Sequence, residues 1–384
     1  MAKADRKPTT RQLEDKFART AFRLSQERND FLLPQILDFV GKHQWLNIHP
    51  EYQRRLVWDV RKKSRFIESL LLNIPIPPLF LYEWELGRYE VMDGQQRLNA
   101  VIEFYENAFA LHGLEKWTEL HGLRFRDLPD ILRRGLDRRR MSATVLLFEG
   151  TPGDQVEQGD VRKIVFERLN TGGQNLNAQE VRNCIYAGSF NALLIRLSQG
   201  KLFTDIWEIP SYQDHVDQQG RPDAARAEDR LYRRMIDCEI VLRFFAFRDR
   251  SNIKGSVRSM LDNAMKAKQN ASEAEITTMA RDLETRLELA HSIFESRTFR
   301  YQDADLNWKL SQPLYDAVMV ALDRLWPRRD TITKKKRAVV RAVTKLFRDE
   351  DAYAIIVGRP NTAKAIRSRI NLVTRTMARA ARLQ

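Results

Sequence analysis

The sequence is poor in cysteine and has no long hydrophobic run. Its 384 residues include only two cysteines, Cys184 and Cys238, which lie far apart in the chain. Such a pair favours buried thiols over a disulfide, as in a reducing compartment. No apolar stretch approaches the ~20 residues of a membrane-spanning helix. The N-terminal segment MAKADRKPTTRQLEDKF also lacks the apolar part of a signal peptide. We therefore expect a cytoplasmic protein that does not enter a membrane.

Two glycine-rich nucleotide signatures are missing as well. The chain contains neither a P-loop pattern nor a Rossmann fingerprint, so any nucleotide site must be of another kind. Histidine is scarce, with six in all. Five of them lack the spacing of metal ligands, which favours core or surface roles: His43, His49, His112, His121 and His215.

Acidic residues are scarce near the C-terminus. Residues 324–384 hold 17 Lys and Arg against 4 Asp and Glu, and residues 1–28 hold 8 against 4. The formal net charge of +14 therefore belongs to the ends of the chain. A concentrated positive charge indicates a polyanionic partner, with nucleic acid ahead of a membrane surface. The alternative is a solvated basic helix without a partner.

Hydrophobic periodicity predicts an α+β fold. Between residues 30 and 150 it favours helices at 33–42, 60–73 and directly after Gly94, and strands at 79–85, 89–92 and 141–150. After Thr151 we expect only helices, including a buried one at 230–249 and one capped by Asn177 with Glu180. These patterns predict a small mixed α/β N-terminal domain followed by a largely all-α C-terminal region.

The expected organisation has three parts. Residues 1–28 form a basic arm or helix, residues 29–200 the mixed domain, and residues 201–384 an all-helical domain with a basic C-terminal end.

The segment Asp93-Gly94-Gln95-Gln96-Arg97 stands where a strand gives way to a helix. A glycine there lets the backbone approach a ligand and leaves the first helical N–H groups free for an anion. The Arg97 guanidinium suits a two-pronged grip on phosphate. Gln95 and Gln96 add amide donors and acceptors, and Asp93 could hold a metal ion or a water. The alternative is a helix start with surface glutamines.

Two further clusters could contribute to such a site. HPEYQRRLVWD, with Tyr52, Gln53 and Arg54, alternates aromatic and basic residues as base stacking and phosphate contact require, although an amphipathic edge has the same pattern. FERLNTGGQNLNAQEVRN holds Asn170, Thr171 and Gly172 in a loop that can wrap a ligand or simply end a helix. The same segment also contains Arg168, Gly173, Glu180, Arg182 and Asn183.

Together these segments resemble the N-terminal domain of GmrSD-type restriction endonucleases, a branch of the ParB/sulfiredoxin-like superfamily. The matching pieces are YQRRLVW, FIESLLLNIPIPPLFLYE, YEVMDGQQRLNAVIEFY and FERLNTGGQNLNAQEVRN, in the family's order. The resemblance implies a ParB/sulfiredoxin-like fold, anti-phage defence, and binding and hydrolysis of a nucleoside triphosphate (NTP) with Mg²⁺ at the DGQQR motif. It also implies DNA, and companion defence proteins or a nuclease, as partners.

The C-terminal part departs from the family's best-known architecture. Many members carry an HNH nuclease, which needs histidine as base and metal ligand. The last histidine is His291, and no cysteine follows it. We therefore do not expect HNH activity.

Three hypotheses follow. In the first, the chain is an NTPase in which Gly94, Gln95, Gln96 and Arg97 hold phosphates. Asp93 then binds the metal or the attacking water, and Arg54 makes a second phosphate contact. In the second, the chain is a non-catalytic DNA-binding or regulatory module. In the third, it nicks DNA with the same N-terminal acids. The sequence leaves a homo-oligomer open.

The C-terminal segment is the predicted DNA-binding surface. Ile366, Ile370, Val373 and Met377 recur as one narrow apolar stripe of a helix, which leaves a positive opposite face. That face would include Lys364, Arg369 and Arg382. The residues expected to follow the DNA backbone are basic and precede or lie on this helix: Lys334, Lys335, Lys336, Arg337, Arg341, Arg367, Arg375 and Arg379.

Overall fold

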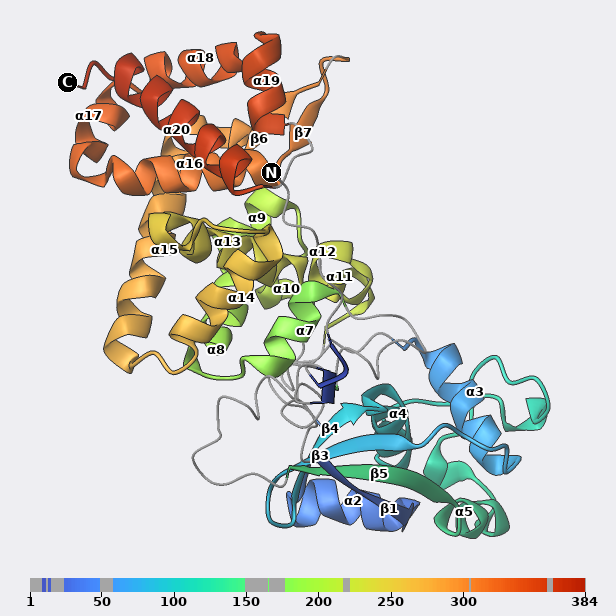
Figure 1. The fold of residues 1–384 in the computed structure, drawn as a ribbon. Coiled ribbons are helices and arrows are strands. Elements are labelled where there is room, and N and C mark those ends of the chain that lie inside the picture. Colours follow the sequence, from blue (N-terminus) through green and yellow to red (C-terminus); the bar gives the residue numbers. More distant parts are fainter. Residues whose placement is uncertain are drawn as a thin grey trace. The chain divides into compact units, whose positions relative to one another are not determined.

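A computed structural model describes residues 9–11, 13–14, 24–48, 58–148, 165, 177–216, 222–303, 305–357 and 362–383. The chain divides into two compact units. The first unit contains the described residues up to Phe148, and the second contains those from Asn177 onward. Figure 1 labels their helices and strands.

The first unit is built on a mixed five-stranded sheet with the order β1-β5-β3-β4-β2. The β1/β5 and β3/β4 pairs are antiparallel, whereas β3/β5 and β2/β4 are parallel. Its helices and strands follow one another in this order: β1 (Leu24–Leu32), α2 (Leu33–Leu37), β2 (Leu46–Asn47), α3 (Val60–Leu71), β3 (Leu79–Glu85), β4 (Arg88–Asp93), α4 (Gln95–Tyr105), α5 (Asp130–Asp137) and β5 (Arg140–Phe148).

One apolar core joins the sheet to the helices of this unit. On α4, Leu98 and Val101 are fully buried, as their spacing predicts. Helix α3 packs on α4 and on α5, with Ile67 and Leu70 inside. The three prolines before Leu79 lie outside the strand that follows them, because proline cannot donate to a sheet ladder.

Strand β1 was not predicted. It pairs with β5 over its whole length, from Leu24 opposite Phe148 to Leu32 opposite Arg140. Its middle residues Gln26, Glu27 and Arg28 are exposed, so it shows none of the apolar alternation by which a strand is recognised. The expected arm or helix of residues 1–28 is therefore wrong from Leu24 onward, because this polar segment forms an edge strand.

The second unit is almost entirely helical. The helices of its described residues and the β6/β7 hairpin have these bounds: α7 (Ala178–Ile185), α8 (Ser189–Ser198), α9 (Lys201–Trp207), α10 (Tyr212–His215), α11 (Ala224–Glu228), α12 (Arg230–Arg233), α13 (Ile236–Arg248), α14 (Val257–Lys268), α15 (Glu273–Phe294), β6 (Arg300–Gln302), β7 (Trp308–Leu310), α16 (Gln312–Arg324), α17 (Arg329–Lys334), α18 (Lys336–Leu346), α19 (Glu350–Val357) and α20 (Ala363–Ala380).

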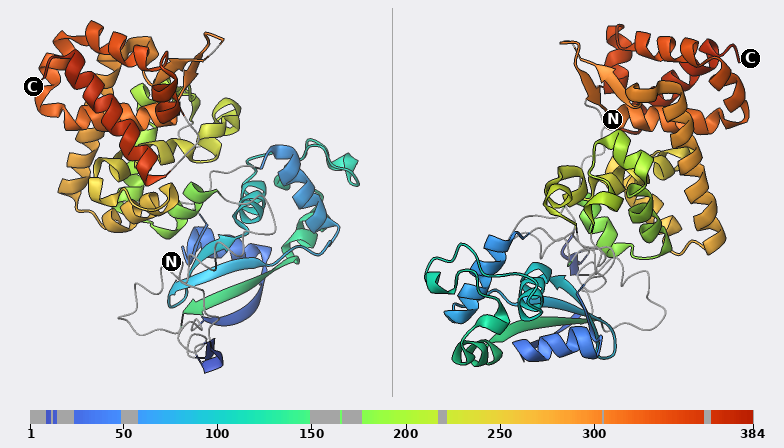
Figure 2. Two further views of the ribbon diagram at one scale, coloured as in Figure 1. Left: turned by 45° about the horizontal axis from the view of Figure 1, so that its top comes forward. Right: turned by 180° about the vertical axis from the view of Figure 1, so that it is seen from behind.

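Three features of this unit differ from the sequence predictions. The antiparallel β6/β7 hairpin, visible in both views of Figure 2, interrupts the expected run of helices. The helix predicted at 230–249 is two helices, because Met235 has a left-handed backbone (φ 52°) between them. Helices α7 and α8 pack against α13, so the helical unit begins well before residue 201.

Helix α13 lies at the centre of the second unit. It packs against α7, α8, α14 and α16 and is buried around its circumference from Ile240 to Phe247. Cys238 on this helix is buried and forms no disulfide with a described residue, as expected for a reduced thiol. The side chain of Cys184 lies outside the described part of the chain. None of the helices in the described residues is both long and apolar enough to span a membrane.

Candidate functional site

The DGQQR segment joins the end of β4 to the start of α4. Asp93 ends the strand, Gly94 occupies the N-cap position with φ 103°, and Gln95 opens the helix. Gly94 has no side chain that could cap the helix. It therefore supplies no side-chain acceptor for the first N–H groups of α4. The predicted strand-to-helix junction is thus present.

Gly94 is required by its backbone and by close packing. A positive φ of this size strains any residue with a Cβ. A Cβ built on Gly94 would also lie 2.3 Å from Cδ2 of Leu79 and 3.2 Å from Nη2 of Arg97. The space that a side chain would occupy is therefore taken by the protein itself. Approach of a phosphate is not needed to explain this glycine.

Arg97 has internal partners. Its Nη2 donates to Oδ2 of Asp93 at 2.9 Å, and its guanidinium also donates to the carbonyl oxygens of Pro77 and Pro78. The side chain is 11% exposed. Burial lowers the pKa of the guanidinium, and the Asp93 carboxylate opposes that shift. Instead of presenting an open fork to solvent, Arg97 ties the start of α4 to β4 and to the proline segment before β3.

Asp93 is the residue expected to hold a metal ion or a water. Its carboxylate is paired with Arg97 and is 43% exposed. Within the described residues there is no group of three or more histidine, cysteine, aspartate or glutamate side chains arranged to hold a metal. Any Mg²⁺ at Asp93 would therefore need ligands from water, from a bound nucleotide or from residues outside the described part.

The two glutamines reach the ends of another segment. Nε2 of Gln95 donates to the carbonyl of Ile48 at 2.9 Å, and Oε1 of Gln96 accepts from the N–H of Trp58 at 3.1 Å. Ile48 and Trp58 are the described residues on either side of positions 49–57. The DGQQR segment therefore contacts the described residues that flank positions 49–57. Both glutamines are partly buried, unlike the surface glutamines of the alternative interpretation.

Several predicted site residues lie outside the described part of the chain. These are Tyr52, Gln53 and Arg54 of the second cluster, and Asn170, Thr171 and Gly172 of the third. Their roles as nucleotide contacts remain predictions.

The end of the third cluster is part of the helical unit. Asn177 caps α7, accepting from the N–H groups of Gln179 and Glu180, and the Glu180 carboxylate accepts from the N–H of Asn177. Glu180 and Asn183 are fully buried. The predicted cap is confirmed, and these side chains stabilise the start of α7.

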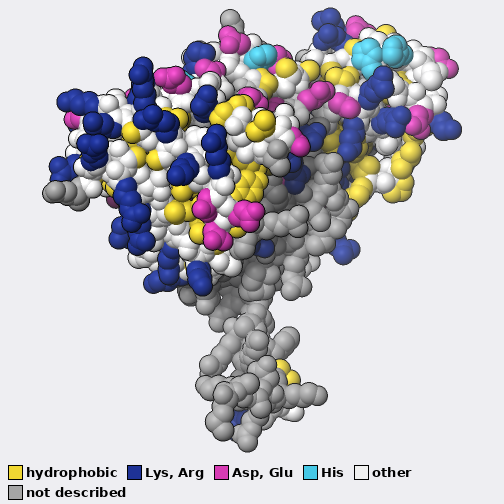
Figure 3. Space-filling model, turned by 90° about the horizontal axis from the view of Figure 1, so that it is seen from above, with side chains coloured by type: hydrophobic (Ala, Val, Ile, Leu, Met, Phe, Trp, Pro, Cys, Tyr) yellow, Lys and Arg dark blue, Asp and Glu magenta, His cyan; other side chains and the backbone are white. Residues whose placement is uncertain are grey.

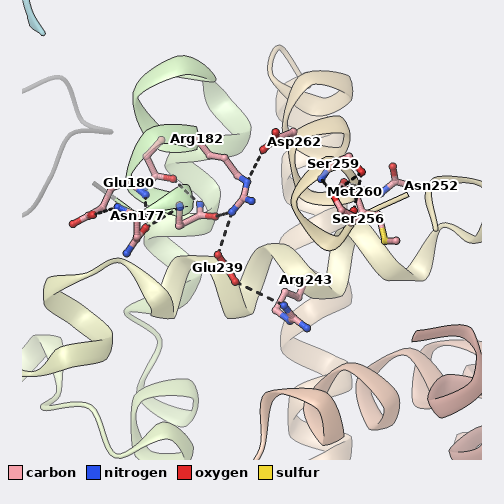
Figure 4. Close-up of polar contacts among 12 residues, drawn as sticks. Asn177, Glu180, Arg182, Glu239, Arg243, Asn252, Ser256, Ser259, Met260 and Asp262 are labelled. Atoms are coloured by element: carbon pink, nitrogen blue, oxygen red, sulfur yellow. Dashed lines mark hydrogen bonds and ion pairs between the residues drawn. The ribbon is translucent and has the colours of Figure 1, made fainter. Parts of the chain in front are cut away.

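Arg182 is buried and belongs to a line of ion pairs whose acidic members Glu239 and Asp262 are partly buried. Figure 4 shows its guanidinium between Asp262 of α14 and Glu239 of α13, at 2.8 and 3.1 Å. Glu239 also lies 3.7 Å from Arg243, one turn further along α13. Burying a charge without a partner is costly, so each of these groups depends on its neighbours.

The line continues to the last helix. Arg243 forms a two-pronged pair with Asp316 of α16, and Asp316 lies 3.9 Å from Arg369 of α20. Arg369 is fully buried, so its expected place on the positive face is wrong. Its counter-charge lies more than fifty residues away in sequence, where the helical periodicity of α20 could not reveal it.

The C-terminal helices carry most of the predicted basic surface. Figure 3 shows Lys and Arg side chains spread over the face seen from above, with fewer Asp and Glu among them. Six of the eight predicted DNA contacts are exposed without an ion pair to another described residue: Lys334, Lys335, Arg337, Arg341, Arg375 and Arg379. Lys336 is half-buried and pairs with Glu295 at 2.9 Å. Arg367 is exposed, but its guanidinium donates to the carbonyl of Ile253.

Residues 36–187 match the model of the GmrSD restriction endonuclease, N-terminal domain. The match contains the DGQQR segment and ends two residues after α7. No curated protein and no solved structure matches the chain.

Proposed function

We propose that this chain binds and hydrolyses an NTP. The proposal is supported by the match of residues 36–187 to the model of the GmrSD restriction endonuclease, N-terminal domain, a family that implies a restriction-like, DNA-associated role in defence. The nucleotide would lie at the start of α4, and the basic helices of the second unit would contact DNA. Turnover would regulate how the protein engages that DNA. We place this activity in the cytoplasm.

One observation supports the proposal above all. Gln95 and Gln96 hold the chain on both sides of positions 49–57 against the N-terminus of α4. Tyr52, Gln53 and Arg54, the predicted nucleotide contacts, lie within that interval of the sequence. The N-terminal end of a helix favours bound anions such as phosphate.

The geometry gives Arg97 a different part from the one its position in the sequence suggests. With its donors directed at Asp93 and at the carbonyls of Pro77 and Pro78, it acts as a positioning residue that fixes the Asp93 carboxylate. Phosphate contacts would come from the helix N-terminus and from Arg54. Mg²⁺, if it takes part, would bind with Asp93 and the nucleotide phosphates.

The test is hydrolysis of each of the four common NTPs with Mg²⁺, with and without duplex DNA. We expect turnover of at least one NTP, altered by DNA, and a loss of at least tenfold in Gln96→Met, which cannot accept from Trp58. Gln35→Met is the matched control, because the Gln35 side chain also accepts a backbone N–H, that of Leu32, but lies outside the motif.

A second function is favoured by the internal pairing of Arg97. If the DGQQR segment only stabilises the fold, the protein is a non-catalytic DNA-binding module. Absence of turnover of any NTP, together with DNA binding that Gln96→Met leaves unchanged, would establish that alternative.

A further inference from the structure

A cavity of about 570 Å³ opens in the first unit, and no residue of the DGQQR segment lines it. Seven residues from the start of α3 and from the loop before α5 line it: Val60, Arg61, His112, Gly113, Leu114, Thr118 and His121. Its volume falls within the range of sites that hold small molecules, roughly 300–1,000 Å³. Neither the sequence motifs nor the family match assigns it a role.

The ionisable groups of this lining favour an anion. Arg61, His112 and His121 can each carry positive charge, and none of the seven lining residues is acidic. Arg61 lies on the first turn of α3, where the helix dipole adds positive potential. Val60 and Leu114 give the cavity an apolar side, so it offers both a charged end and a surface for an uncharged body.

The two histidines form a pair. Their ring centroids are 4.7 Å apart, and the ring planes meet at 81°. Both side chains are exposed to solvent. Two imidazoles this close can donate to different oxygens of one phosphate, which a single surface histidine cannot do.

The loop that carries these histidines is held firmly. Oγ of the buried Ser64 accepts from the N–H of His112 at 2.9 Å. The buried Glu68 carboxylate accepts from the N–H groups of Glu115, Lys116 and Trp117 at 2.7 to 3.1 Å. A loop fixed in this way before binding loses little entropy when a ligand arrives.

Gly113 brings Arg61 against this loop. It has φ +66°, and a Cβ built on it would lie 3.3 Å from Cγ of Arg61. The stem of Arg61 therefore lies along the Gly113 backbone, and Arg61 lines the same cavity as the histidine pair.

We propose that this cavity binds a phosphorylated small molecule, with the phosphate held by Arg61, His112 and His121 and the uncharged body against Val60 and Leu114. A mononucleotide and a sugar phosphate share this chemistry. The site is distinct from the DGQQR segment and does not depend on NTP hydrolysis there.

Calorimetry on the full chain can test this with four probes: inorganic phosphate, ribose 5-phosphate, AMP and adenosine. We expect phosphate to bind weakly, at least one of the two phosphorylated molecules to bind at least tenfold more tightly, and adenosine not to bind. Tighter binding of AMP than of ribose 5-phosphate would identify the ligand as a nucleotide. Equal affinities of AMP and ribose 5-phosphate would identify it as a sugar phosphate. In NMR spectra the ring signals of His112 and His121 should shift with the bound probe.

The variants His112→Gln/His121→Gln and Arg61→Gln should each lower the affinity for the tighter probe at least tenfold. The matched control is His43→Gln, because His43 is also exposed and stacks on a ring, that of Trp45, outside the cavity. Its affinity should equal that of the wild type.

Four results would overturn the proposal. The first is that neither phosphorylated probe binds at millimolar concentration, and the second is that adenosine binds as tightly as AMP. The third is that the double histidine variant keeps the affinity of the wild type. The fourth is that His43→Gln loses as much affinity as the double histidine variant. The variant Gln96→Met separates the two sites. If it abolishes AMP binding while the double histidine variant does not, the nucleotide lies at the DGQQR segment, so the cavity proposal fails and the proposed function stands.

Discussion

Oε1 of Gln96 accepts a hydrogen bond from the N–H of Trp58 at 3.1 Å, across 38 positions of sequence. Trp58 is the residue before Asp59, which caps α3 by accepting from the N–H of Lys62. The start of α4 and the start of α3 are thus linked through one glutamine. This contact explains why DGQQR pairs a glycine with glutamines: the glycine makes the turn, and the glutamines fix a neighbouring segment against it.

Gly94→Ala should destabilise the first unit more than Gly87→Ala does. Both glycines have positive φ, but only at Gly94 would a Cβ meet another atom, Cδ2 of Leu79. The backbone term alone costs about 1–2 kcal/mol, and the clash adds to it at Gly94. Thermal unfolding of both variants measures the difference. The double variant Gly94→Ala/Leu79→Val should recover part of the loss, and no recovery would contradict the packing argument.

Arg97→Ala should lower the free energy of unfolding by roughly 2–3 kcal/mol, because it removes a charged hydrogen bond to Asp93 and contacts to two carbonyls. The stability of Arg97→Lys should lie between that of the wild type and that of Arg97→Ala, since lysine keeps the charge but not the planar fork. Denaturant unfolding followed by circular dichroism gives both values. Unchanged stability with lost nucleotide binding would instead restore Arg97 as a direct phosphate ligand.

Glu68 should make the first unit sensitive to acid. Burial raises the pKa of its carboxyl, but the N–H groups of Trp117, Lys116 and Glu115 outweigh that effect and hold the pKa below the ordinary value of 4.5. A lowered pKa in the folded state means that its stabilisation is present above pH 4.5 and is lost as the pH falls below it. The stability difference between wild type and Glu68→Gln should therefore be largest near neutral pH and shrink in acid. A difference independent of pH from 7 to 3 would contradict this assignment.

Asp316→Asn should destabilise the second unit by about 3–5 kcal/mol, because it leaves the guanidinium groups of Arg243 and Arg369 short of their shared counter-charge. Asp330→Asn is the control, since Asp330 is 84% exposed and its loss should cost no more than about 0.5 kcal/mol. Chemical denaturation compares the two. Equal stability of both variants would show that the buried pairs contribute nothing net.

Neutralising three exposed arginines of the C-terminal helices should weaken DNA binding and its dependence on salt. For Arg337, Arg375 and Arg379 changed to Gln, the slope of log K against log salt should fall by about 2.7, at roughly 0.9 per phosphate contact. The matched control changes Arg126, Arg134 and Arg138 in the first unit, which are also exposed, to Gln. Fluorescence anisotropy with duplex DNA at several salt concentrations measures both slopes. If the first triple variant binds as the wild type does at every salt concentration, the basic face serves another purpose.

Local patterns predicted most of the first unit and the site's position in it. The periodicity of residues 95–105 predicted α4 and its buried stripe, and the prolines before Leu79 predicted where β3 begins. The apolar residues Ile366, Ile370, Val373 and Met377 are all fully buried, as their spacing predicts. These predictions are confirmed because each feature depends on residues within one or two helical turns of one another.

The sequence by itself thus determined helices α3 and α4, strands β3, β4 and β5, the strand-to-helix turn at Gly94 and the basic character of the C-terminal helices. Only the tertiary structure decided which charged side chains are available to bind a ligand. Arg97 and Arg369 look like free cations in the sequence, yet one pairs with Asp93 and two prolyl carbonyls, and the other lies buried beside Asp316. The edge strand β1 was likewise decided by its pairing with β5, more than a hundred residues later. Hydrogen bonds and ion pairs between distant segments leave no periodicity in the sequence, because they depend on which surfaces the fold brings together.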